Sequence, residues 1–139
     1  MAVDEMVAFI IARLDEQEER ARRCTPGKWK VWGLSVMADP TGNSLVEECT
    51  DVAHTVMVDV AGKPRTFDAQ HIARYGPVQV LAEITARREM VTGLHAAIGR
   101  AWQFGEEARE LVAQLAVLML QQFAALDRDH RDYDPGWEV

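Results

Sequence analysis

The chain has 139 residues, of which 48% are hydrophobic and 27% charged, and its formal net charge is −7. This size and composition are typical of a single globular domain with a real core, and they exclude a disordered or membrane-embedded protein. The acidic balance opposes attraction to nucleic-acid phosphates unless a local basic patch is present, so nucleic acid is not an expected partner. A variant of this hypothesis is that the acidic surface imitates nucleic acid.

Residues 1–23 predict an amphipathic helix. Its apolar residues recur at helical spacing and are followed by a strongly charged stretch through Arg23. They are Val3, Val7, Ile10, Ile11 and Leu14. The helix is expected to end before Pro26 and Gly27, because proline cannot continue the hydrogen-bond ladder.

The following segment, residues 28–60, predicts a small three-stranded antiparallel sheet. The stretch from Trp29 to Val36 is rich in residues that favour strands and predicts the first strand. Gly33 within it indicates a bulge. A strong turn signal then leads to a partner strand from Leu45 to Cys49, and the third candidate runs from His54 to Val60.

Residues 66–126 predict a helical part. Thr66 or Asp68 can cap a short helix that runs through Tyr75, and Pro77 suits the first turn of a long helix. Gly105 separates this helix from the last one, so the two are expected to form a hairpin. The predicted fold class is α+β in a single domain, residues 1–139, with an irregular tail over residues 127–139.

The sequence contains no phosphate-binding loop and no catalytic or dinucleotide-binding motif, so neither an enzyme nor a bound cofactor is expected. No two of its histidines and cysteines have metal-ligand spacing. The alternative is a small metal-dependent enzyme or metal-binding regulator that uses His71 and His130. The two cysteines and the short apolar runs favour a reduced, cytoplasmic protein with no membrane span.

Four blocks of sequence carry a resemblance to a family of small actinobacterial and actinophage proteins of unknown function. We call them the opening, turn, central and closing blocks: Phe9–Glu16, Thr25-Pro26-Gly27-Lys28-Trp29, His71-Ile72-Ala73-Arg74, and Asp129-His130-x-x-Tyr133 followed by Trp137. The turn block is also similar to one in the Ea22-type accessory proteins of phage lambda. The resemblance implies a phage or prophage origin and, by association, an action on host proteins.

The candidate contact residues come from these blocks and from the last helix. Aromatic and arginine side chains concentrate in protein-binding hot spots, so the expected partner-binding residues are His71, Arg74, His130, Tyr133 and Trp137. We therefore expect a non-enzymatic module that binds a host or phage protein.

The last helix is apolar around more than one side. One broad face contains Leu111, Val112, Leu115, Leu118, Met119 and Phe123. Val117 and Leu120 lie elsewhere on the same helix, and a chain of this size has few elements left to cover them. The sequence therefore predicts a homodimer with Val117 and Leu120 at its seam.

Overall fold

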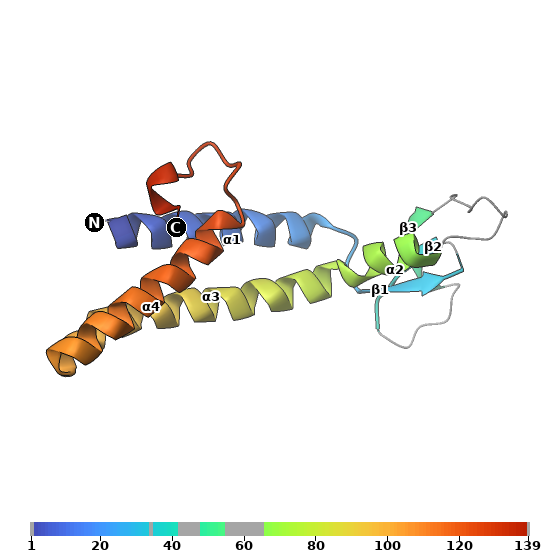
Figure 1. Cartoon of the computed structure of the whole chain (residues 1–139). Helices are drawn as coiled ribbons and strands as arrows, with labels where there is room; N and C mark the ends of the chain where they lie inside the picture. Colours follow the sequence, from blue (N-terminus) through green and yellow to red (C-terminus); the bar gives the residue numbers. More distant parts are fainter. Residues whose placement is uncertain (1, 34, 42–47, 55–65, 139) are drawn as a thin grey trace. The chain divides into compact units, whose positions relative to one another are not determined.

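The structure is a computed structural model that describes residues 2–33, 35–41, 48–54 and 66–138. It has the predicted α+β class (Figure 1). The elements are α1 (Ala2–Arg23), β1 (Lys28–Trp32), β2 (Ser35–Asp39), β3 (Thr50–His54), α2 (Thr66–Arg74), α3 (Pro77–Arg100) and α4 (Glu106–Ala125), with 3₁₀ turns η2 (Ala101–Gln103) and η3 (Pro135–Trp137).

The contacts group the chain into two compact units, and each is described by itself. Unit 1 comprises residues 1–16 and 85–139, and unit 2 comprises residues 17–84. The boundary falls within α1 and within α3. The single domain expected from the sequence stays a prediction.

The helices begin and end where the sequence signals place them. α1 ends at Arg23, and α3 begins at Pro77, whose missing N–H costs nothing in a first turn. The chain reverses at η2 and Gly105, so α3 and α4 form the predicted helical hairpin (Figure 1). The core of unit 1 draws on α1, α3, α4 and η3. Its buried members include Met6, Phe9, Ile10, Leu14, Val91, Ala116, Leu120, Ala124 and Trp137.

The sheet has three antiparallel strands in the order β1-β2-β3, as expected, but its strands lie elsewhere. Gly33 is in a turn, not a bulge: it has a φ of 63°, and Trp32 pairs with Ser35 across it. The expected first strand is therefore a hairpin, because glycine reaches the positive φ that short hairpin turns need. The irregularity in the sheet lies between Val36 and Met37.

The described part of the second expected strand is not a strand, and most of the third lies outside the described residues. The prediction of a strand ending at Cys49 is wrong, because the strand begins at Thr50, and residues 45–47 lie outside the described residues. Of the third candidate, only His54 is described, as the end of β3. The error came from assuming a short connection after the turn signal, whereas ten residues separate β2 from β3.

In unit 2, α2 packs against β1 and β2. Val36, Ala38 and Ala69 are buried there. Asp39, at the end of β2, is 1% exposed, and its carboxylate meets Lys30 Nζ at 2.5 Å and the Thr41 N–H at 3.1 Å. A buried carboxylate needs such partners, since leaving it unpaired would cost several kcal/mol, on the order of 3–5.

Candidate functional site

In unit 1 the opening block on α1 contacts the closing block of the C-terminal segment. The ring of Phe9 lies 6.0 Å from that of His130, 5.9 Å from that of Tyr133 and 5.2 Å from that of Trp137. Tyr133 and Trp137 also contact each other edge to face, at 5.6 Å. Aromatic pairs in this distance range stabilise a fold beyond their buried area. Phe9 is therefore the centre of a cluster that holds the C-terminal segment against α1.

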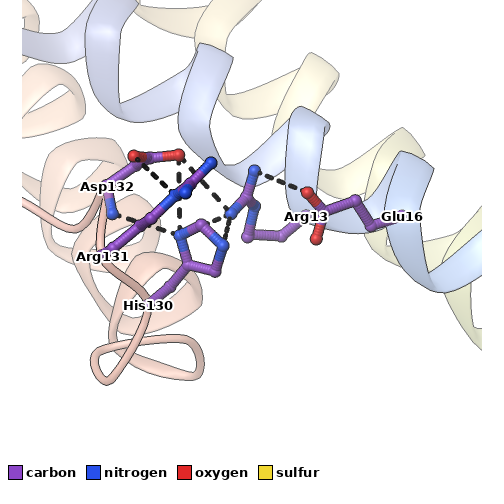
Figure 2. Close-up of polar contacts among 5 residues, drawn as sticks. All are labelled: Arg13, Glu16, His130, Arg131 and Asp132. Carbon is purple, nitrogen blue, oxygen red and sulfur yellow. Dashed lines mark hydrogen bonds and ion pairs between the residues drawn. The ribbon is translucent and has the colours of Figure 1, made fainter.

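Arg13, one turn after Phe9, adds polar contacts to this cluster (Figure 2). Its guanidinium contacts the ring nitrogens of His130, forms an ion pair with Glu16 at 3.1 Å, and lies 3.9 Å from Asp132. It also lies over the Phe9 ring, with Cζ 5.3 Å from the centroid. Arg13 is only 8% exposed, so its charge is balanced by nearby carboxylates and by the aromatic face.

Three polar atoms of the cluster are buried and lack a hydrogen-bond partner: Arg13 Nε, the Tyr133 hydroxyl and the Trp137 indole N–H. Tyr133 and Trp137 line a cavity of about 290 Å³, together with Gln121, Gln122 and Arg128. Buried polar groups usually have a hydrogen-bond partner, so these three atoms are an exception in the described part of the chain.

This geometry determines how much of each predicted contact residue of the closing block is exposed. Trp137 is 6% exposed, so the prediction that it contacts a partner is corrected. Its side chain packs against Phe9 and Tyr133 instead. Tyr133 and His130 are half-buried in the same cluster. The sequence did not single out Phe9 or Arg13 as the residues that these side chains meet.

The exposed apolar face of α4 differs from the predicted one. Leu120 is completely buried, so its assignment to a dimer seam is corrected, and Val117 is half-buried. Leu111, Leu115 and Leu118 are instead 67%, 58% and 45% exposed. We call these three residues the leucine stripe. Its spacing of four and three residues places them on one side of the helix, opposite Leu120.

In unit 2 the turn block is held by close packing. The Trp29 indole N–H donates to the Thr25 carbonyl at 3.0 Å, and a Cβ on Gly76 would lie 2.9 Å from the Trp29 side chain. Gly27 has a φ of 103°, and a Cβ there would lie 2.5 Å from the Asp39 carbonyl oxygen. A residue with a Cβ would clash at either position, so both Gly27 and Gly76 need to be glycine.

A cavity of about 410 Å³ lies where β1 meets α2 and the start of α3. The described residues that line it include Lys28, Trp29, Lys30 and Arg74, and no aspartate or glutamate is among these described residues. Arg74 was a predicted contact residue, and its side chain is exposed, as is that of Lys28. The sequence missed Lys28 and Lys30 because the acidic total charge concealed a local group of cations.

His71, the remaining candidate, is exposed on α2, with its ring 4.9 Å from that of Tyr75. It belongs to unit 2 and His130 to unit 1. Within the described part of the chain, no group of three or more histidine, cysteine or carboxylate side chains is placed to hold a metal ion. None of the described helices is both long and apolar enough to cross a membrane.

These features define a small α+β protein with an exposed leucine stripe in one unit and a cation-lined cavity in the other. The chain belongs to the family of unknown function DUF6221, which matches residues 3–139. No curated protein and no solved structure matches the sequence.

Proposed function

We propose that this protein is a non-enzymatic protein-binding module that associates with a second copy of itself through α4. The observation that carries the proposal is the leucine stripe, which leaves three large apolar side chains exposed on one side of a 20-residue helix. Covering each of them is worth roughly 1.5–3 kcal/mol. An apolar helix face of this kind is a common element of protein-protein interfaces.

The charge pattern favours a second copy as the occupant of this face. From Leu111 to Leu126 the sequence contains no charged residue. Two such faces can pair without burying an unpaired charge, and a twofold axis makes one face its own complement. The spacing of the leucine stripe is also that of a helix-helix seam.

A host protein is the further partner in this proposal. The support for it is the resemblance of the four blocks to small phage proteins, which is an analogy and not a contact. The proposed module would then present two copies of each binding surface to that partner.

Sedimentation equilibrium tests the self-association. The wild type is expected to have twice the 15.6 kDa chain mass at micromolar concentration, and Leu111→Glu/Leu118→Glu is expected to be a folded monomer. The matched control is Met90→Glu, which alters an exposed apolar residue of α3 and should leave the dimer intact. A wild type with the mass of one chain at every concentration would refute the seam.

A further inference from the structure

The cavity of about 410 Å³ in unit 2 borders one long edge of β1. Four consecutive residues of this strand, Lys28 to Val31, line it, and so do residues of α2 and the first turn of α3. Of the strand residues that the structure describes, none from β2 or β3 lines it. Within the described sheet, the lining of the cavity is therefore confined to β1.

β1 is an edge strand of the sheet formed by the described residues, since it pairs there with β2 alone. In antiparallel pairing, every second residue of an edge strand points its backbone N–H and C=O away from its neighbour. These groups can pair with an added strand, a recurrent mode of peptide recognition.

The lining of the cavity is cationic. Lys28, Lys30 and Arg74 contribute three positive charges, and no aspartate or glutamate is among the described residues that line it. Lys30 is already paired with the buried Asp39 carboxylate. Lys28 and Arg74 have no ion-pair partner among the described residues and are exposed. In a chain with a net charge of −7, this local reversal of sign selects a negatively charged ligand.

We propose that this cavity binds an acidic segment of a partner protein in an extended conformation, as an added strand along β1. Backbone pairing with β1 would set its direction, and its carboxylates would meet Lys28 and Arg74. The inference rests on the proposed protein-binding function, but it does not depend on the leucine stripe.

Two observations favour a peptide over nucleic acid. The Trp29 ring is packed against Gly76 and its N–H is bonded to Thr25, so it offers no open platform on which bases could stack. The net charge of −7 also repels a long polyanion at a distance, whereas a short acidic segment meets mainly the local cations.

Fluorescence anisotropy with the full-length protein tests this proposal. The probe is a labelled peptide of alternating glutamate and threonine, capped at both ends. We expect saturable binding that weakens with added salt. Two peptides of the same length serve as comparisons: one has lysine for glutamate, and one has proline for threonine. The first has the wrong charge, and the second lacks half of the N–H groups needed for strand pairing. Both should bind at least about fivefold more weakly.

Variants of the protein locate the binding site. Lys28→Gln/Arg74→Gln should weaken binding of the acidic peptide about fivefold or more, because it removes both free cations. The control Arg109→Gln removes one exposed cation from α4 in unit 1 and should change the affinity less than about twofold. Lys30 is left unchanged, since its removal would take away the ion pair that the buried Asp39 carboxylate makes with it.

Three results would overturn the proposal: equal affinity in the double variant, equal affinity for the proline peptide, or tighter binding of an oligothymidylate than of the acidic peptide. The first would place the site elsewhere, the second would mean that charge alone acts, and the third would identify a nucleic-acid site. The monomeric Leu111→Glu/Leu118→Glu variant should bind the peptide normally. Failure of the seam is thereby distinguished from failure of this site.

Discussion

The two units both bring together blocks that are far apart in the sequence, but they leave different side chains exposed. In unit 1 the opening and closing blocks pack against each other and bury their aromatic side chains, since Phe9 and Trp137 are 7% and 6% exposed. In unit 2 the turn block packs through Trp29 against Gly76, which follows the central block, yet Lys28 and Arg74 remain at the surface. The blocks of unit 1 therefore leave little side-chain surface exposed, whereas those of unit 2 leave two cations beside a cavity.

This difference follows from what surrounds each block. The closing block meets an apolar turn of α1, where burying aromatic surface is favourable and little is left to contact a partner. The turn block leads into β1, an edge strand of the sheet formed by the described residues, where long cationic side chains reach water. The surroundings of each block therefore decide which of its side chains are buried and which are exposed.

The largest effect that would sharpen the comparison is expected at Trp137. Trp137→Ala should lower the free energy of unfolding by about 3–5 kcal/mol, because it removes a buried indole from the cluster around Phe9. The control Trp102→Ala, at a side chain that is 70% exposed, should change it by less than about 0.5 kcal/mol. Urea denaturation followed by circular dichroism measures both. Equal effects would mean that Trp137 is not part of the core.

A smaller effect is expected in unit 2 at Gly76. Gly76→Ala should destabilise the protein by about 1–3 kcal/mol, because the new Cβ would press on the Trp29 ring. Gly93→Ala has the opposite expected sign: its Cβ meets nothing within 4 Å in the interior of α3, so it should stabilise by about 0.5–1 kcal/mol. Thermal unfolding of the two variants gives the signs directly. A stabilising Gly76→Ala would rule out the packing described for the turn block.

The smallest effect is expected at Arg13. Arg13→Ala should cost about 1–2 kcal/mol, since it removes the guanidinium from the Phe9 face and from His130. Arg22→Ala, on the same helix, breaks an exposed pair with Glu18 and should cost no more than about 0.5 kcal/mol. Limited proteolysis after the same substitutions should show faster cleavage of the C-terminal segment in Arg13→Ala alone. Identical digestion of the two variants would contradict a holding role for Arg13.

Much of the fold could be predicted from local signals. The ends of α1 and the start of α3 follow from proline and glycine, whose backbone limits act within a few residues. The strands were harder to predict, because Gly33 suits either a bulge or a turn, and the pairing of β1 with β2 decides between them.

The candidate sites were predicted only in part. His130, Tyr133 and Arg74 were identified by residue type, but which of them is buried depends on tertiary contacts with Phe9 or β1. On α4, helical spacing alone divided the apolar residues into two sides and could not say which side meets α1 and α3. The structure places Leu120 inside and the leucine stripe outside.

The most direct test of the proposed binding function is cysteine cross-linking on α4, in a Cys24→Ser/Cys49→Ser background. Leu115 is the middle residue of the leucine stripe, so either a parallel or an antiparallel seam brings its two copies together, within the short reach of a disulfide. Under mild oxidation Leu115→Cys should form a covalent dimer, and Val117→Cys, which points to another side of α4, should not. Preferential cross-linking through Val117→Cys, or none from either variant, would contradict the proposed seam.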